Sequence, residues 1–295
     1  MLCKFSPPNK YGLSNLENCH FLCRHFADFN DPFEFWSKFN FRKGAPNREK
    51  EPDRFLAAIK TWGLPETELD NIDDDSTREY FEEMSEQESI FSPAFDKMRI
   101  SCFSSDPANL LLWSHYADGL RGYCAIFDPE MVCTESDTTS LVDVAYANAP
   151  PEIDSFLYAI SVDQLDYHLM AIDEAEAAAR LGDSSEEARY LLSDYRDAAD
   201  DAHEQILAMW KRAYATKPKE WMYEKEQRLL VLSEGEGPEP IFYNYPKNAL
   251  KEVVVGERMP ANYKKSLIKV LSNNYENVRI RTAVRARNYY SIQVV

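Results

Sequence analysis

The sequence predicts an α+β fold in which a mixed, strand-rich core is decorated by inserted acidic helices. Short apolar segments typical of strands are spaced irregularly along the chain, without the regular β-α-β alternation of a parallel sheet. There is no Gly-x-Gly-x-x-Gly motif and no P-loop, so a Rossmann or NTPase fold is disfavoured. The two strongest helical insertions are also the acidic ones.

Strands are expected where short runs of apolar, β-branched and aromatic residues are bounded by turn residues. Their expected ranges are Leu2–Phe5, His20–Phe26, Arg99–Ser104, Gly122–Asp128, Leu141–Tyr146, Gln227–Leu232, Ile241–Tyr243, Glu252–Gly256, Val278–Val284 and Tyr290–Val295.

Helices are expected where apolar residues recur at intervals of three and four. The expected ranges are Leu13–Asn18, Asp53–Trp62, Ser76–Phe91, Asn109–Ala117, one or two long helices within 163–215, and Ala261–Asn273. We expect residues 1–295 to form a single α+β domain, with helical inserts at about 53–96 and 163–215.

The net charge of −17 is unevenly distributed. Residues 66–96 hold 12 acids and one base, residues 163–205 hold 13 acids and three bases, and the remainder of the chain sums to +4. A uniformly acidic protein would repel nucleotides and nucleic acid, whereas this remainder could still bind an anionic ligand. Solvated helix faces would give the same two acidic stretches.

Six cysteines, at positions 3, 19, 23, 102, 124 and 133, include no Cys-x-x-Cys pair. A zinc site at Cys19 and Cys23 would need a second ligand pair that the sequence lacks, so buried thiols are expected and no metal is predicted. The sequence has no uncharged apolar run of about 18 residues and no signal-peptide core. We therefore expect a cytoplasmic protein with no membrane partner.

The first of three candidate site blocks is the turn Phe29–Glu34, with the sequence Phe-Asn-Asp-Pro-Phe-Glu. Asn30 and Asp31 could hold a ribose or a base edge while a neighbouring phenylalanine ring stacks on it. The alternative is an Asx turn pinned by two core aromatics, because Asn and Asp side chains bond to nearby backbone and the residue before proline avoids the α region.

The second block runs from Ser101 to Cys124. Ser104 ends a predicted strand but lacks the strained Gly-x-Ser-x-Gly turn of a nucleophile. His115 and Asp118 lie three residues apart on one side of a predicted helix, which suits an imidazole oriented for acid–base chemistry, although a lone helical histidine can equally be structural. Trp113 and Tyr116 are spaced as a buried helix face would be.

The third block is Glu220–Arg228, which four apolar residues follow. In a strand that begins by Glu224, the side chains of Glu224, Glu226 and Arg228 project from one face, with the two carboxylates about 6–7 Å apart. One carboxylate would stabilise a cation, the other would take a proton, and Arg228 would grip a phosphate. An exposed, salt-bridged strand face would have the same pattern.

In order and spacing, these blocks resemble a bacterial family known only as domain-of-unknown-function family 2971. Its members have a Leu-Tyr-Lys-Tyr opening, an Asn-Asp-Pro-Phe-Glu turn, a Cys-Phe-Ser strand, a Met-Trp-Ser-His-Tyr-Ala helix followed by Gly-x-Cys, and a Trp-x-x-Glu-x-Glu-x-Arg segment. The similar segments here are Leu2–Phe5, Asn30–Glu34, Cys102–Ser104, Leu112–Ala117, Gly122–Cys124 and Trp221–Arg228. Cys3 in place of a tyrosine and the two acidic inserts depart from the pattern.

A more distant resemblance, to ADP-ribosyltransferase-like folds with a split sheet, implies an activity. Those folds place a basic or polar residue on a first strand, a serine at the end of a later strand and Glu-x-Glu on a strand further on, and Lys4, Ser104 and Glu224-x-Glu226 follow that order. The resemblance implies that Glu226 steadies the oxocarbenium-like state as nicotinamide leaves NAD, with Glu224 as its partner. It also implies that Ser104 is a positioning residue and that Lys4 contacts phosphate or ribose.

The function implied is an ADP-ribosyltransferase-like enzyme with NAD as its substrate, in bacterial antiphage defence or toxicity. Tyr116 or Trp113 would stack on nicotinamide. The partners would be a nucleotide-type small molecule and a protein or nucleic-acid target. Two alternatives stay open. One is a metal-dependent nuclease or phosphohydrolase that uses magnesium, held by Asp31, Glu34, Glu224 and Glu226. The other is a non-catalytic interaction or sensing module whose acidic helices bind a basic partner.

Overall fold

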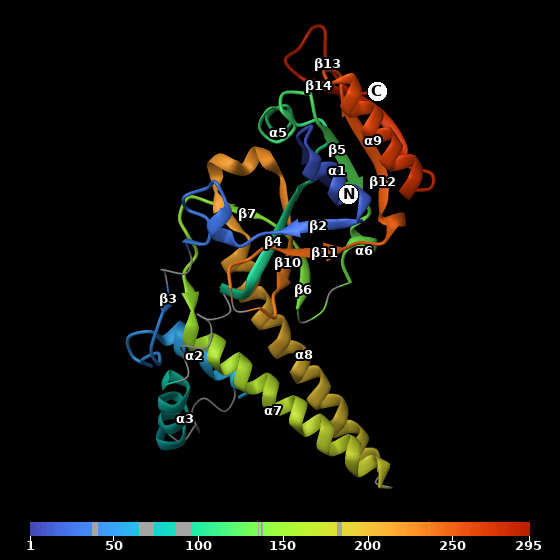
Figure 1. Cartoon of the computed structure of the whole chain (residues 1–295). Helices are drawn as coiled ribbons and strands as arrows, with labels where there is room; N and C mark the ends of the chain where they lie inside the picture. The colour runs from blue at the N-terminus through green and yellow to red at the C-terminus, as the bar shows by residue number, and fades with distance from the viewer. Residues whose placement is uncertain are drawn as a thin grey trace. The chain divides into compact units, whose positions relative to one another are not determined.

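The computed structural model describes residues 1–36, 41–64, 74–86, 96–134, 136, 138–181, 185–235 and 237–295. Proximity of Cα atoms divides the chain into two compact units (Figure 1). Unit 1 comprises Met1–Glu34, Asp96–Ala149 and Ala215–Val295, and unit 2 comprises Phe35–Phe95 and Pro150–Tyr214. In sequence, unit 2 is thus two insertions into unit 1, and these contain nearly all of the predicted helical inserts. The expectation of a single domain stays a prediction.

Unit 1 is built on an eight-stranded sheet with the strand order β14-β13-β12-β5-β1-β4-β10-β6. Its strands are β1 (Leu2–Ser6), β4 (Met98–Ser104), β5 (Tyr123–Phe127), β6 (Thr139–Asp143), β10 (Glu226–Leu232), β12 (Leu250–Gly256), β13 (Arg279–Arg285) and β14 (Ile292–Val294). The β12–β13 pair is parallel, whereas the other neighbours pair antiparallel. This mixed sheet, together with the helices, confirms the predicted α+β fold.

Helices cover both faces of this sheet. The remaining elements of unit 1 are α1 (Lys10–Glu17), β2 (His20–Cys23), the 3-10 turn η1 (Phe26–Asp28), α5 (Leu110–His115), α6 (Pro129–Val132), β7 (Ala145–Ala147), β9 (Thr216–Pro218), η5 (Lys219–Glu224), β11 (Ile241–Asn244), η6 (Lys247–Ala249) and α9 (Ala261–Asn274). Leu16 of α1 and Leu267 of α9 pack into the core on one face, whereas Trp113 of α5 packs on the other. Two small sheets, β2–β11 and β7–β9, complete the unit.

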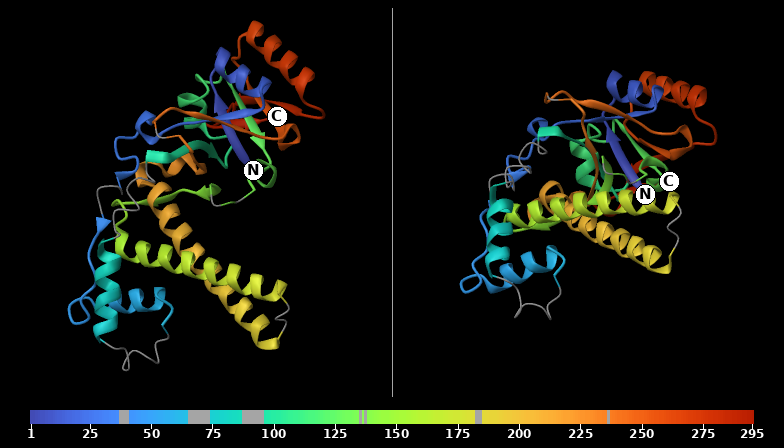
Figure 2. Two further views of the ribbon diagram at one scale, coloured as in Figure 1. Left: turned by 60° about the horizontal axis from the view of Figure 1, so that its bottom comes forward. Right: turned by 90° about the horizontal axis from the view of Figure 1, so that it is seen from below.

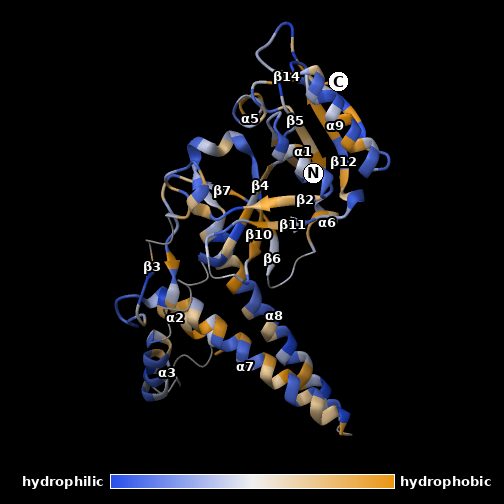
Figure 3. Cartoon of the chain, in the orientation of Figure 1, coloured by the Kyte–Doolittle hydropathy of each residue, from blue (hydrophilic) through white to orange (hydrophobic). Residues whose placement is uncertain are grey.

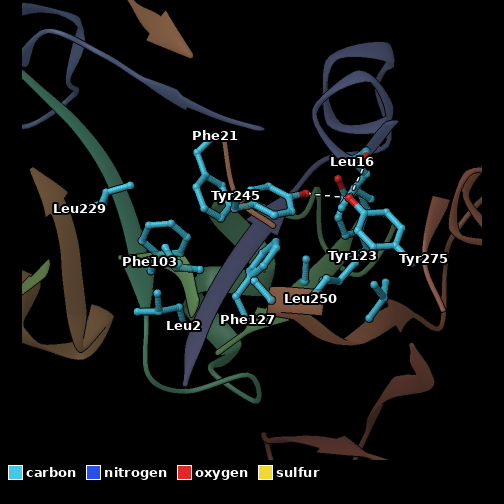
Figure 4. Packing of buried hydrophobic residues seen from close by; sticks show 14 of the residues in the cluster. Leu2, Leu16, Phe21, Phe103, Tyr123, Phe127, Leu229, Tyr245, Leu250 and Tyr275 are labelled. Atoms are coloured by element: carbon cyan, nitrogen blue, oxygen red, sulfur yellow. Dashed lines mark hydrogen bonds between the residues drawn. The ribbon is translucent and has the colours of Figure 1, made fainter. Parts of the chain in front are cut away.

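Phe21 on β2 packs against three other rings in the larger core (Figure 4). Its ring centroid lies 4.9 Å from those of Phe103 and Phe127 and 4.5 Å from that of Tyr245. The hydroxyls of Tyr245 and Tyr275 are hydrogen-bonded to each other at 2.8 Å. Because a buried phenol needs a partner, this bond lets two tyrosines fill a position that is otherwise apolar.

Two predicted strands are shortened or divided in the structure. The segment His20–Phe26 is a strand only as far as Cys23, where β2 ends. The segment Leu141–Tyr146 is divided between β6 and β7, because the backbone N–H of Val144 donates to Glu226 O at the large sheet whereas β7 pairs in parallel with β9.

Unit 2 is mainly helical over its described residues. Its elements are β3 (Phe41–Arg42), α2 (Pro52–Thr61), α3 (Asp74–Glu86), β8 (Ile153–Asp154), α7 (Ser155–Arg180) and α8 (Glu186–Tyr214). α7 and α8 form an antiparallel hairpin (Figure 2), in which Trp210 Nε1 donates to Tyr158 OH at 3.2 Å. The rings of Phe81 and Phe156 pack at 5.1 Å in a core that α2, α3 and α7 share.

Acidic residues are concentrated in unit 2, which holds 29 acids and 13 bases, whereas unit 1 holds 21 acids and 20 bases. Hydrophilic and apolar residues are interspersed along α7 and α8 (Figure 3), as solvated helix faces require. Unit 1 is therefore close to neutral, and its own net charge does not exclude an anionic ligand. In the described part of the chain, no helix is both long enough and apolar enough to span a bilayer.

Gly256, at the end of β12, is a packing constraint that can be tested. A Cβ atom at this position would lie 2.1 Å from the carbonyl oxygen of Leu120, a backbone atom that cannot rotate away. We expect Gly256→Ala to lower the free energy of unfolding by about 1–3 kcal/mol or more, as overpacking does, measured by urea denaturation. Gly235→Ala is the control, because its nearest contact would be the Ser233 hydroxyl at 3.4 Å. Equal stability of the two variants would contradict this packing.

Candidate functional site

Five ionisable side chains form a continuous chain of ion pairs at the start of β10, termed here the charge cluster: Glu34, Lys217, Glu224, Glu226 and Arg228. Lys217 Nζ lies 2.7 Å from Glu224 Oε2 and 2.9 Å from Glu226 Oε2. Arg228 Nε lies 2.8 Å from Glu226 Oε1, and Arg228 Nη1 lies 2.6 Å from Glu34 Oε1. Glu226 therefore has a cation on each of its carboxylate oxygens.

Strand pairing explains how the centre of the cluster is assembled. Side chains alternate along a strand, so Glu226 and Arg228 point to the same face of the sheet. In the antiparallel pairing with β4, Ser104 is opposite Glu226 and Cys102 is opposite Arg228. Residues directly opposite each other share a face, so all four side chains lie on one side of the sheet.

Glu224 reaches the cluster from a turn. The arrangement considered for a strand that begins by Glu224 is not found, because β10 begins at Glu226 and Glu224 ends the 3-10 turn η5. Lys225 between them adopts a left-handed φ of 45°, which interrupts the alternation of side chains. The two glutamates nevertheless meet, because Lys217 on β9 bonds to both.

The central residues of the cluster are buried and charged. Arg228 is 0% exposed, Glu226 5% and Lys217 7%. Burial alone would raise the pKa of Glu226, but the charges of Arg228 and Lys217 outweigh burial and lower that pKa to about 2. Burial alone would lower the pKa of Lys217, but Glu226 and Glu224 raise it above its ordinary value. Glu226 and Lys217 therefore both stay ionised at neutral pH.

Glu34 differs from Glu226, although both pair with Arg228. Burial raises the pKa of Glu34, and the charge of Arg228 only partly offsets that effect. The physical reason is the number of neighbouring cations: Glu226 contacts two, whereas Glu34 contacts one that it shares. Glu34 is thus more easily protonated than Glu226.

Three hydroxyl groups fix the two central glutamates. Tyr116 OH donates to Glu224 Oε1 at 2.9 Å, and burial together with the charge of Glu224 raises the pKa of this phenol, which therefore keeps its proton. Ser104 Oγ donates to Glu224 O at 2.7 Å, and Tyr146 OH accepts the backbone N–H of Glu226 at 2.8 Å. Of the predicted site residues, the structure brings together Ser104, Tyr116, Glu224, Glu226 and Arg228.

Lys4 lies on the opposite face of the sheet from the charge cluster. Cys3 is the residue paired with Ser104, so the next side chain along β1 points the other way. Lys4 Nζ donates to Ser101 Oγ and to Cys102 O, both at 2.8 Å. Burial lowers the pKa of this ammonium group. The expected convergence of Lys4 with Ser104 and the glutamates is not found.

The remaining predicted residues of the second block are divided between core and surface. Trp113 is 1% exposed, donates through Nε1 to a backbone carbonyl at 2.8 Å, and packs edge-on against Phe5 at 5.4 Å. Its indole therefore belongs to the core. His115 is exposed at the end of α5, and Asp118, the acid expected to orient it, pairs with Arg121 at 3.5 Å.

The first block joins the cluster through Glu34 rather than through Asn30 or Asp31. Asn30 is exposed, whereas Asp31 is 5% exposed and its Oδ1 accepts the N–H of Phe33 at 2.9 Å, as in an Asx turn. The other oxygen, Asp31 Oδ2, is buried and has no hydrogen-bond partner among the described residues. The turn positions Glu34 so that its carboxylate accepts a hydrogen bond from Arg228 Nη1. Through this contact the first block takes part in the site.

Lys217 is a site residue that the sequence analysis missed. It lies seven residues before Glu224, on the far side of η5, and no local periodicity places it against two carboxylates. The available signal was the reappearance of basic residues after the second acidic stretch, first at Lys211 and Arg212 and then in the run Thr-Lys-Pro-Lys at 216–219. Such a run is equally typical of an exposed loop, so it did not distinguish a buried cation from a solvated one.

A comparison with protein-family models matches residues 112–229 to the family described as Protein of unknown function (DUF2971). The matched range contains Tyr116, Lys217 and the segment Glu224–Arg228, whereas Glu34 lies outside it. No curated protein and no solved structure gave a match. Over the residues that the structure describes, no group of three or more His, Cys, Asp or Glu side chains is arranged to hold a metal ion.

Lys217→Met tests the shared cation of the cluster. Methionine keeps much of the volume but leaves two buried carboxylates without their common partner, so we expect the free energy of unfolding to fall by about 3–5 kcal/mol, measured by urea denaturation at pH 7. Lys217→Arg keeps the charge and should retain most of that stability. Lys251→Met is the control, because Lys251 is exposed and pairs with Asp128 at 3.5 Å; it should cost less than about 1 kcal/mol. Equal losses in the two methionine variants would contradict this role.

The lowered pKa of Glu226 predicts how stability depends on acid. A carboxyl whose pKa falls from 4.5 in the unfolded chain to about 2 in the fold stabilises the fold above pH 4.5, and that contribution is lost as the pH falls toward 2. The difference in stability between the wild type and Glu226→Gln should therefore be largest near neutral pH and shrink by roughly 1.4 kcal/mol per unit below pH 4.5. A difference that stays constant from pH 7 to pH 3 in urea denaturation would refute the lowered pKa.

Proposed function

We propose that this protein is an ADP-ribosyltransferase-like enzyme that cleaves NAD at the charge cluster. The observation that carries the proposal is the buried and ionised Glu226, with Glu224 held beside it by Lys217. As the bond between nicotinamide and ribose breaks, positive charge develops on the ribose. A fixed carboxylate in a water-poor site stabilises such an oxocarbenium-like state.

The contacts of the cluster support a division of roles. Glu226 faces the developing charge and Glu224 is its partner at the ribose. Tyr116, which is 37% exposed and bonded to Glu224, offers its ring to nicotinamide. Ser104 bonds to the backbone of Glu224 and is a positioning residue. Arg228 orients the Glu226 carboxylate, because its Nε donates a hydrogen bond to Glu226 Oε1.

Two expected contacts have no part in this proposal. Lys4 points away from the cluster, and the indole of Trp113 is enclosed in the core. The phosphate groups of NAD therefore need another partner than Lys4, and the stacking role falls to Tyr116.

The two alternative functions have less support. A metal-dependent nuclease needs several carboxylates that converge on one divalent cation, but among the described residues no group of three or more His, Cys, Asp or Glu side chains is arranged to hold one. An interaction module would use the acidic helices of unit 2 to bind a basic partner. Within the enzyme proposal, the same helices suit a basic protein as the target of transfer better than a nucleic acid, because they repel phosphates.

The family match supports placing the chain in the DUF2971 family. We include in the proposal a bacterial, cytoplasmic setting in antiphage defence or toxicity. Such a setting supplies NAD as the substrate and cellular proteins as targets.

Incubation with labelled NAD and a cell lysate tests the proposal, with free nicotinamide, ADP-ribose and labelled protein as the measured products. We expect the wild type to release nicotinamide and Glu226→Gln to lose about 100-fold or more of that rate, because the amide carries no charge. Glu252→Gln is the matched control, since Glu252 is also a strand glutamate paired with an arginine, Arg281, at 3.3 Å.

Addition of a chelator separates this proposal from the nuclease alternative, because NAD cleavage should persist while metal-dependent hydrolysis stops. A folded wild-type protein that releases no nicotinamide and labels no target would overturn the proposal.

A further inference from the structure

A tight turn after α5 has an arginine on either side of it. Asp118, Gly119 and Leu120 all have left-handed backbone conformations, with φ angles of 50°, 59° and 68°. The turn is closed by hydrogen bonds from the Gly119 N–H to Trp113 O at 3.0 Å and from the Gly122 N–H to Ala117 O at 2.8 Å. The position of Gly119 is therefore fixed by the end of α5.

The side chains of Arg121 and Arg258 flank Gly119. Arg258 Nη1 donates to Gly119 O at 3.2 Å, and the backbone N–H of Arg258 donates to Leu120 O at 3.0 Å. Arg121 Nη1 donates to Asp118 O at 3.0 Å. A Cβ atom at residue 119 would lie 3.6 Å from Arg258 Nη1 and 3.7 Å from Arg121 Nη1. Two guanidinium groups thus approach one point, over a residue that has no side chain.

The acids around this arginine pair do not cover it. Asp118 Oδ1 lies 3.5 Å from Arg121 Nη1, and both side chains are about half exposed, with 41% for Arg121 and 51% for Asp118. Glu257, the neighbour of Arg258, forms an ion pair with Arg285. Arg285, and to a smaller extent Arg258, lower the pKa of Glu257, so this second carboxylate also acts on the pair. An anion with several oxygens would relieve the repulsion between the two guanidinium groups, and guanidinium forks match phosphate oxygens in geometry.

One member of the arginine pair, Arg121, is close in sequence to a residue that contacts the charge cluster. Tyr116, whose hydroxyl bonds to Glu224, is two residues before Asp118 and five before Arg121. The turn packs through Leu120 on the same face of the sheet as Trp113, which is also the face that presents Glu226. The hydrogen bond from Tyr116 to Glu224 therefore connects the segment before this turn to the charge cluster.

We infer that Arg121 and Arg258 form the binding site for the diphosphate of a dinucleotide, an inference that rests on the proposed function and names where its substrate is held. The pair supplies the phosphate contact that Lys4 does not make. A small diphosphate suits the pair better than nucleic acid. Asp118 and Glu257 flank the two arginines, and the chain has a net charge of −17. The arginines therefore attract a compact anion, whereas the surrounding negative charge repels a long polyanion.

Calorimetric titration with pyrophosphate and with ADP tests the inference directly. We expect both anions to bind the wild type, and Arg121→Ala together with Arg258→Ala to weaken binding at least about 10-fold, as the loss of charge-assisted hydrogen bonds does. Arg180→Ala is the matched control, because Arg180 is an exposed arginine of unit 2 paired with Glu176 at 3.3 Å; it should leave binding unchanged. Should the double alanine variant unfold, Arg121→Lys with Arg258→Lys keeps the charge and should weaken binding less than alanine but measurably.

The outcomes separate this inference from the proposed function. Pyrophosphate binding that depends on both arginines, without any NAD cleavage, would support the arginine pair and refute the reaction. NAD cleavage whose KM is unchanged in the double variant, or equal weakening by Arg180→Ala, would overturn the arginine pair alone. A single-stranded oligonucleotide that binds through both arginines more tightly than pyrophosphate would also overturn it, in favour of a nucleic-acid surface.

Discussion

The two ion pairs of Glu226, with Lys217 on one oxygen and Arg228 on the other, are the interaction on which the rest of the site depends. A carboxyl buried to this degree would otherwise take up a proton, because burial in protein penalises the charged form. The two cations reverse that preference, and they are themselves held charged by the glutamates around them. Buried ion pairs of this kind contribute little net stability, but removing one partner leaves a charge that nothing offsets. The cluster is therefore a cooperative unit in which the neighbouring charges keep Glu226, Lys217 and Arg228 ionised.

The fold builds this unit from segments that are far apart in sequence. β10 lies between β4 and β6 in the sheet, so Glu226 and Arg228 are on an interior strand that is paired along both edges. Glu34 is the last residue of unit 1 before the first insertion, and Lys217 follows closely after the chain returns from the second. The cluster thus belongs wholly to unit 1, whereas nearly all of the net negative charge of the chain lies in unit 2. This separation lets a strongly acidic protein keep a nearly neutral unit for an anionic substrate.

The sequence was sufficient to predict the strands and much of the candidate site, but not the contacts made through topology. Apolar runs such as Gln227–Leu232 predicted strands well, because burial on both faces leaves an unmistakable pattern. Glu224, Glu226 and Arg228 were predicted together because they are close in sequence. Lys217 was missed because only the turn η5 and the pairing of β9 bring it to them. Lys4 was assigned to the right strand but the wrong face: a shift of one residue in register exchanges the two faces, and nothing local in the sequence fixes that Cys3, not Lys4, is opposite Ser104.

The central claim is that Glu226 is a permanently charged carboxylate inside the fold. A carbon-13 NMR titration of the glutamate carboxyl groups measures this directly, with Glu226→Gln used to assign the signal. We expect the Glu226 signal to stay in the ionised position from pH 8 down to about pH 3 and to begin to move only near pH 2. A Glu226 carboxyl that titrates at or above the ordinary glutamate value of about 4.3 would contradict the account, because the cations would then not control its charge.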